Sequence, residues 1–183
     1  QGEHIALVGP NGGGKSLLVD ILIGRWPLLM NEVKYHFPSS DSGMVCDHIR
    51  YITFRDSYGD ADGTFYYQQR WNKWDETSSP TVAEALGDAA QWSEEISALM
   101  VGDEAFCSRQ LHLLSSGELR KFHLAKALRG NPRVLIIDNP YIGLDVAARQ
   151  TLTQVLQALA ERISLILVVS DRADIPPFIT HVV

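Results

Sequence analysis

One glycine-rich stretch between an apolar strand and a helix constrains the fold more than any other part of the chain. Residues 9–16, GPNGGGKS, fit the pattern G-x-x-x-x-G-K-[ST] and follow directly on the apolar run of residues 4–8. Glycines let the backbone wrap closely around phosphate groups, and the N–H groups of such a loop and the following helix N-terminus attract anions. The stretch therefore predicts a strand, a phosphate-binding loop and a helix in succession.

The residue types in this loop also predict which parts of a nucleotide they contact. Lys15 is expected to reach the terminal phosphates, and the Ser16 hydroxyl is expected to ligate Mg²⁺. The alternative is a glycine-rich turn with an incidental lysine, which the strand and helix on either side disfavour. The expected phosphate-binding residues of the loop are Gly9, Pro10, Asn11, Gly12, Gly13, Gly14, Lys15, Ser16 and Leu17.

Strand and helix patterns alternate along the rest of the chain. Leu17, Leu18, Ile21 and Leu22 have the spacing of a buried helical face. A helical pattern at residues 119–128 precedes the strand VLIID, and a further helical pattern at 152–159 precedes a β-branched run that ends at Ser170. Apolar strands that alternate with helices predict an α/β fold with a parallel sheet covered on both faces.

Composition excludes several classes of protein. The 183 residues suffice for one domain with a sizeable core, and a net charge of −6 with a pI near 5.4 argues against a nucleic-acid surface. Cys46 and Cys107 have neither disulfide-framework nor zinc-site spacing, which fits a reducing, cytoplasmic location. No apolar run approaches the ~20 residues that span a bilayer. The abrupt ends suggest a piece of a longer protein.

Phosphate chemistry also needs a ligand for the metal ion. The buried strand of residues 134–138 ends in Asp138, which a parallel sheet places at its carboxyl edge beside the glycine-rich loop. Asp138 and Ser16 are therefore the expected Mg²⁺ ligands. The alternative is that Asp138 caps the next helix, and the glycine-rich loop disfavours it.

A second anion site is expected about twenty residues earlier, in the segment LLSSGELRK. Free N–H and hydroxyl groups at the start of a helix bind whatever anion lies beyond it. The alternative is a helix-capping box. The residues expected to take part are Ser115, Ser116, Gly117 and Glu118.

With these motifs in this order, and GLD at residues 143–145, nearly the whole chain resembles the ATP-binding cassette (ABC) ATPases. The resemblance implies ATP and Mg²⁺ as cofactors and a RecA-like P-loop core at residues 1–53 and 114–183. A helical subdomain is expected at residues 54–113, within one nucleotide-binding domain that is truncated at both ends. The resemblance also implies head-to-tail pairing with a second cassette, in which LLSSGELRK, the signature segment of the family, lies against the partner's ATP. Membrane-embedded transport subunits are further expected partners, which would place this chain at the inner face of the plasma membrane as a peripheral subunit.

The chain departs from the family pattern at three places. Asn139 stands where the family has the glutamate that polarises the attacking water, and VVSDR offers Ser170 and Asp171 where the family has a histidine. Asn139 and Asp171 are therefore the expected catalytic positions, both altered. The place of the magnesium-sensing glutamine falls at Phe54. Gln68 or Gln69 serves instead if the loop folds back; otherwise this aromatic-rich stretch is a packing or partner surface.

Two functional interpretations stay open at this stage. Several blocks resemble one half of a tandem cassette protein associated with molybdate transport, in which one composite site can be weak while the other works. In the first interpretation the chain is a cassette of a transport motor. In the second it is a nucleotide-gated dimerisation module of a soluble, non-transport ABC protein.

Overall fold

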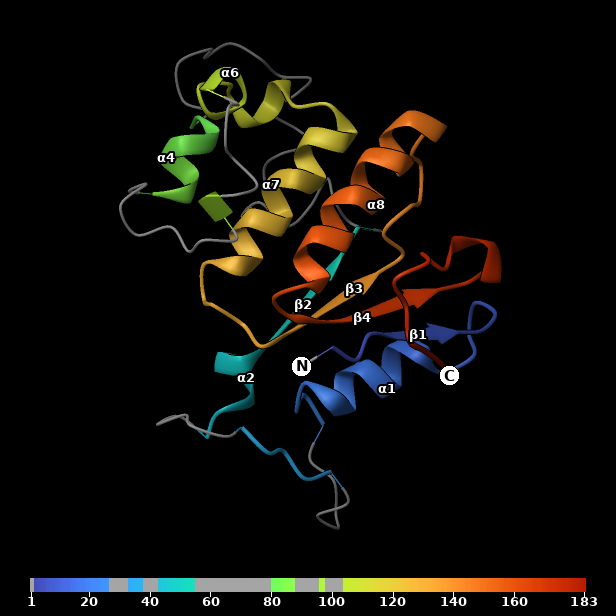
Figure 1. Ribbon diagram of the computed structural model, residues 1–183. Helices are drawn as coiled ribbons and strands as arrows, with labels where there is room; N and C mark the ends of the chain where they lie inside the picture. Colours follow the sequence, from blue (N-terminus) through green and yellow to red (C-terminus); the bar gives the residue numbers. More distant parts are fainter. Residues whose placement is uncertain (1, 27–32, 38–42, 55–79, 88–95, 98–103) are drawn as a thin grey trace.

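A parallel sheet of five strands, in the order β2-β3-β4-β1-β5, forms the centre of the protein (Figure 1). The computed structural model describes residues 2–26, 33–37, 43–54, 80–87, 96–97 and 104–183. Every strand pair is parallel, so all strands end at the same edge of the sheet. The strands are β1 (Ile5–Val8), β2 (Ile49–Thr53), β3 (Val134–Asp138), β4 (Ser164–Val169) and β5 (His181–Val182).

Helices cover the two faces of the sheet. The helices α7 and α8 lie on one face, and α1 lies on the other (Figure 1). The helices are α1 (Lys15–Leu22), α2 (Val45–His48), α4 (Val82–Leu86), α6 (Glu104–Cys107), α7 (Ser116–Leu128) and α8 (Val146–Ala160), with short 3-10 turns η2 (Leu111–Leu113) and η3 (Arg172–Asp174).

The alternation of side chains along β3 separates the core into two parts. Leu135 and Ile137 belong to the cluster packed under α7 and α8, whereas Ile136 belongs to the smaller cluster under α1. Side chains two residues apart on a strand share a face, so Asp138 lies on the α1 side with Ile136. The strand thus delivers its last carboxylate to the face that carries the glycine-rich loop.

The predicted α/β class and parallel sheet are confirmed, and the predicted strand at residues 134–138 has those bounds. The predicted buried face of the first helix is wrong. Leu17 and Leu18 are 56% and 41% exposed, while Val19 is buried and Ile23 packs beside it. Val19 and Ile23 are four residues apart and share one face. That face alone meets the sheet, because a helix this short covers only a narrow strip.

The expected helical insertion is described only in part. Within it, α4, residues 96–97 and α6 are helical. Gln68 and Gln69 lie outside the described residues, and the subdomain boundaries stay a prediction. Within the described ranges, no helix is long and apolar enough to cross a membrane.

Buried His4 ties the start of β1 to two other segments. Its Nδ1 accepts a hydrogen bond from the Leu165 N–H at 3.2 Å, and its ring meets the Phe178 ring edge-on. Thr180 Oγ1 accepts from the His4 N–H at 2.8 Å and donates to the His4 carbonyl at 2.9 Å. Burial lowers the pKa of His4 below its ordinary value, so the ring is neutral with Nδ1 as an acceptor.

This arrangement predicts that His4 makes the fold acid-sensitive. A group whose pKa is lowered in the folded state contributes stability above its unfolded pKa, and that stability is lost as pH falls below it, here about 6.5. In His4→Asn the amide oxygen can accept the Leu165 N–H but does not titrate. Circular dichroism melts should therefore show a smaller fall in Tm for the variant than for the parent between about pH 7.5 and pH 5. Equal falls would contradict the assignment.

Candidate nucleotide-binding site

The loop between β1 and α1 is closed by its own backbone. The Gly13 N–H donates to the Pro10 carbonyl at 3.0 Å, and a Cβ added at Gly13 would lie only 3.0 Å from that oxygen. Gly12 and Gly14 adopt φ values of 83° and 82°, in the left-handed region that favours glycine. Gly12, Gly13 and Gly14 are therefore required by this turn, whatever it binds.

Lys15 points its ammonium group back into the loop. Its Nζ donates to the Gly9 carbonyl at 2.5 Å and to the Pro10 carbonyl at 3.0 Å. These contacts hold a positive charge in the concave side of the turn, where a phosphate would lie. Ser16 and Leu17, the next residues of α1, are exposed.

Asp138 is buried at the end of β3 and receives a hydrogen bond on each carboxylate oxygen. Tyr51 Oη donates to Oδ2 at 3.1 Å, and Asn139 Nδ2 donates to Oδ1 at 2.5 Å. Burial, followed by the charge and hydrogen bond of Asp138, raises the pKa of Tyr51 to about 12, so Tyr51 stays protonated and remains a donor. The register of β2 explains the contact, because Tyr51 lies beside Ile136, two residues before Asp138.

These groups fit Mg²⁺ bound together with a phosphate. Hydroxyl and carboxylate oxygens are ligands that Mg²⁺ prefers, and Mg²⁺ usually keeps several waters and substrate phosphates. Among the described residues there is no group of three or more His, Cys, Asp or Glu that could hold a metal ion alone. Ser16 and Asp138 are the residues that would contact Mg²⁺, and the positively charged loop is the part that would hold the phosphates.

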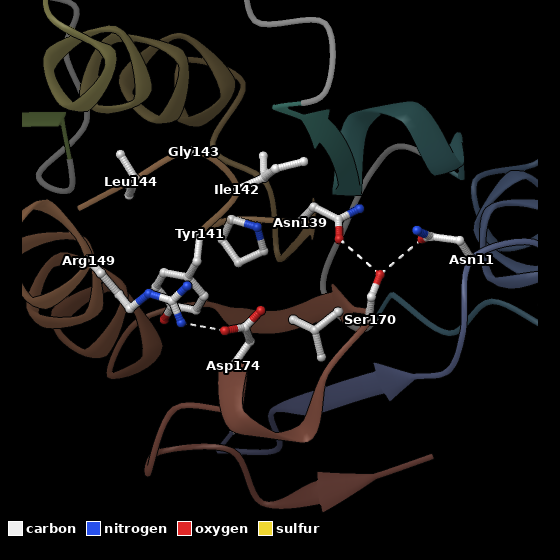
Figure 2. A pocket seen from close by; sticks show the side chains of 11 residues that line it. Asn11, Asn139, Tyr141, Ile142, Gly143, Leu144, Arg149, Ser170 and Asp174 are labelled. Atoms are coloured by element: carbon white, nitrogen blue, oxygen red, sulfur yellow. Dashed lines mark hydrogen bonds and ion pairs between the residues drawn. The ribbon is translucent and has the colours of Figure 1, made fainter. Parts of the chain in front are cut away.

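Asn139 connects β3 to the loops after β1 and β4. Its backbone has a φ of 49°, which asparagine tolerates better than most residues, and its N–H donates to the Val168 carbonyl at 2.8 Å. Ser170 Oγ lies 3.4 Å from Asn139 Oδ1 and 3.1 Å from Asn11 Oδ1 (Figure 2). A hydroxyl has a single proton, so Ser170 donates to one of these oxygens at a time.

A cavity of about 330 Å³ opens beside Asn139 and extends along the loop that follows it. Among the described residues that line it, the one acidic side chain is Asp174. Asp174 forms an ion pair with Arg149 of α8, whose guanidinium group lies 5.0 Å from the centre of the Tyr141 ring (Figure 2). The one carboxylate among the described lining residues is therefore already engaged in an ion pair.

Ser170, rather than Asp171, is the residue that lies beside Asn139. The exposed Asp171 caps η3, where its Oδ1 accepts a hydrogen bond from the Ala173 N–H at 2.9 Å. The sequence offers Ser170 and Asp171 together at this place and predicts Asp171 as the catalytic position, whereas it predicts no role for Tyr51 or Arg149. The signal for Ser170 is its place as the first residue after β4, since β4 ends at Val169.

Phe54 follows β2 at the place expected for the glutamine, and it is a core residue. It is 2% exposed, and the guanidinium carbon of Arg120 lies 5.1 Å from the centre of its ring. Arg120, buried on α7, donates to the Pro140 carbonyl at 2.8 Å and also to the Ile142 carbonyl. An aromatic and a buried arginine thus fix this corner, and a magnesium-sensing role at Phe54 has no chemical support.

The segment before α7 forms a capping box. The Glu118 N–H donates to Ser115 Oγ at 3.3 Å, and the Ser115 N–H donates to Glu118 Oε2 at 2.9 Å. Burial acts to raise the pKa of Glu118, but hydrogen bonds from Ser115 and the positive charge of Arg109 outweigh it and leave the pKa lowered. Ser116 is exposed. The start of α7 lies well away from the loop after β1 (Figure 1), so within one chain it cannot contact the same phosphate.

Comparison with known proteins agrees with this geometry. Residues 1–142 match the sequence profile of the family described as ABC transporter. The chain belongs to the ABC transporter family. The cassette is 33% identical to the ABC transporter ATP-binding protein ModF of Escherichia coli (strain K12), over 97% of this chain and 36% of that protein. ABC ATPases bind ATP with Mg²⁺, which the loop and Asp138 suit.

Two further proteins resemble the cassette. An uncharacterised ABC transporter ATP-binding protein of Schizosaccharomyces pombe, C323.04, is 29% identical over 98% of the chain and 39% of its own length. The chain therefore spans less than two fifths of either of these relatives. The solved structure of cbiO1 from Clostridium perfringens, part of the ABC transporter complex cbiONQ, has the same fold, with a TM-score of 0.70 and 21% identity over 98% of this chain and 71% of that one.

The position of Lys15 predicts that its removal weakens ATP binding. A hydrogen bond to a charged group contributes about 1.5–3 kcal/mol, or roughly 10- to 150-fold in affinity. Isothermal calorimetry with Mg·ATP should show a loss of this size for Lys15→Ala. Lys126→Ala, which removes an exposed lysine near the far end of α7, is the control and should bind as the parent does. Unchanged affinity in Lys15→Ala would refute the phosphate assignment.

Proposed function

We propose that this cassette binds Mg·ATP in the loop of residues 9–16 and hydrolyses it only slowly. The phosphates lie over Lys15, and Ser16 and Asp138 ligate the metal. The observation that carries the slow cleavage is the cavity beside Asn139, where the one acidic side chain among the described lining residues, Asp174, is paired with Arg149. A water in this place meets a neutral amide and no free carboxylate of those residues.

The absence of a general base should lower the rate of ATP hydrolysis without weakening the binding of Mg·ATP. An amide can orient a water molecule, but it cannot take its proton. General-base help is typically worth 10²- to 10⁴-fold, or roughly 3–5 kcal/mol of barrier. The loop and Asp138, which act on the bound ground state, keep their residue types. Affinity for Mg·ATP and turnover should therefore separate in this cassette.

We extend the proposal to the assembly. The cassette pairs head to tail with a second cassette, so that Ser115, Ser116, Gly117 and Glu118 complete the partner's ATP site. The exposed side chains of Ile142 and Val146, on either side of the GLD segment, support an apolar contact surface there. The pair powers or gates transport, of the molybdate type by resemblance, through membrane-embedded subunits.

Restoring the family residues tests the holding site. The variant is Asn139→Glu with Ser170→His, assayed with a partner cassette that lacks its own catalytic glutamate, at saturating Mg·ATP. We expect slow release of phosphate in the parent, little gain from either single change, and a gain of at least tenfold from the pair. Residues that act as a unit are strongly non-additive.

Asn139→Glu with Asp171→His is the matched control. Because Asp171 caps η3, a histidine there should not replace the missing donor, and the control should stay slow. A gain in the control instead of the Ser170 variant would assign the altered catalytic position to Asp171. A parent that already turns over at the normal rate of the partner's site would overturn the proposal.

The signature segment generates a separate prediction. Ser116→Arg places a long, charged side chain on the exposed start of α7, so it should reduce ATPase activity of the assembled pair at the partner's site. ATP binding to this chain alone should be unchanged, because α7 begins far from its own loop. Thr151→Arg on exposed α8 is the charge-matched control. Undiminished activity of Ser116→Arg would leave the segment as a helix cap only.

A further inference from the structure

Asp138 receives hydrogen bonds from two neutral donors, Tyr51 on β2 and Asn139 directly after β3, and neither belongs to the phosphate-binding loop. We propose that Tyr51 and Asn139 are positioning residues that hold the Asp138 carboxylate in one orientation for the divalent ion. Asn139 thereby has a function of its own, which the glutamate that it replaces does not provide. The inference rests on the proposed binding of Mg·ATP.

Tyr51 is held so that its hydroxyl reaches one oxygen of the carboxylate. Its ring packs against the apolar cluster under α1, formed around Leu7 and Val19, and the guanidinium carbon of Arg25 lies 5.7 Å from the ring centre. From this position Oη donates to Asp138 Oδ2 at 3.1 Å. Because the ring is packed against this cluster, the hydroxyl has little freedom to turn away.

Asn139 is held by its backbone and reaches the other oxygen. Its N–H is bound to the Val168 carbonyl at 2.8 Å, and its Nδ2 lies 2.5 Å from Asp138 Oδ1. The orientation of the amide follows from its partners. An ionised carboxylate only accepts hydrogen bonds, so the NH₂ group faces Asp138, and the oxygen faces the Ser170 hydroxyl. A glutamate at position 139 has no such donor and would bring a second negative charge to Asp138.

Each carboxylate oxygen accepts more than one hydrogen bond or ligand. With one lone pair of each oxygen engaged by a donor, a second lone pair on each oxygen remains for a metal ion. Partners of this kind around a metal ligand typically contribute 10- to 100-fold to metal affinity. Loss of either donor should therefore weaken metal-dependent nucleotide binding and spare binding that needs no metal.

The test compares two affinities for an ATP analogue that resists hydrolysis, one with Mn²⁺ and one with EDTA. The variants are Tyr51→Phe, and Asn139→Gly, which suits the positive φ and removes the amide. We expect each to lose about tenfold of the affinity gained on adding Mn²⁺, while affinity in EDTA stays within about twofold. In both variants the electron paramagnetic resonance spectrum of the bound Mn²⁺ should be broader than in the parent, which a purely structural role of Tyr51 and Asn139 would not produce.

Tyr35→Phe is the matched control. The Tyr35 hydroxyl lies 3.2 Å from the Ile21 carbonyl oxygen and 3.1 Å from that of Leu22, so its single proton is shared between these two acceptors at the end of α1. It should keep the full gain from Mn²⁺. If the parent gains from Mn²⁺ and both variants keep that gain, the positioning role is overturned and the proposed function stands. If the parent binds the analogue but gains nothing from Mn²⁺, both are overturned.

Discussion

The parallel pairing of the strands is the constraint on which the site depends. Because β1, β2, β3 and β4 run in one direction, their carboxyl ends lie at one edge, and the residues just beyond them meet. The register pairs Val8 with Val169, and Asp138 with both Thr53 and Val168. Asn11, Asn139 and Ser170 therefore come together although they are far apart in the sequence. A shift of one residue in any pair would turn these side chains to the other face.

One face of the sheet carries most of the apolar core, and the other carries the polar groups of the candidate site. The larger core under α7 and α8 fixes the register, since most of the fully buried apolar side chains belong to it. The α1 face carries the loop, Tyr51 and Asp138, and it has the smaller apolar cluster. The side chain of Arg149 on α8 connects two parts of the cavity wall, because it lies over the Tyr141 ring and forms an ion pair with Asp174 in the turn after β4. Packing on one face thus positions polar groups on the other.

Local patterns carried most of what the sequence predicted. The glycine-rich loop depends on the φ values of its own residues, and the apolar strand of residues 134–138 depends on its own run of β-branched and leucine side chains, so both were found without a structure. The sequence also placed Asp138 correctly, because the rule for carboxyl edges needs only a strand that ends there. The parallel sheet followed from the alternation of strands and helices.

The misses depend on contacts between distant segments. By spacing alone, Leu17 and Leu18 fit the buried face of the first helix as well as Val19 does. Only the position of the sheet makes Val19 the buried residue. Whether Ser170 or Asp171 lies in the site depends on the residue at which β4 ends. Tyr51 becomes a partner of Asp138 only through the pairing of β2 with β3, about 87 positions away in sequence.

The altered residues form a chemically consistent set. With Asn139 and Ser170, the site has neutral side chains at both places, and the Ser170 hydroxyl lies within hydrogen-bonding distance of both Asn139 and Asn11. A glutamate at 139 would face the same serine hydroxyl with a negative charge and would lose the donor that now reaches Asp138. The neutral pair therefore stabilises one arrangement of the loops around Asp138. This arrangement supports the proposed slow hydrolysis, because the side chains at 139 and 170 lie within hydrogen-bonding distance of each other and neither is a carboxylate base.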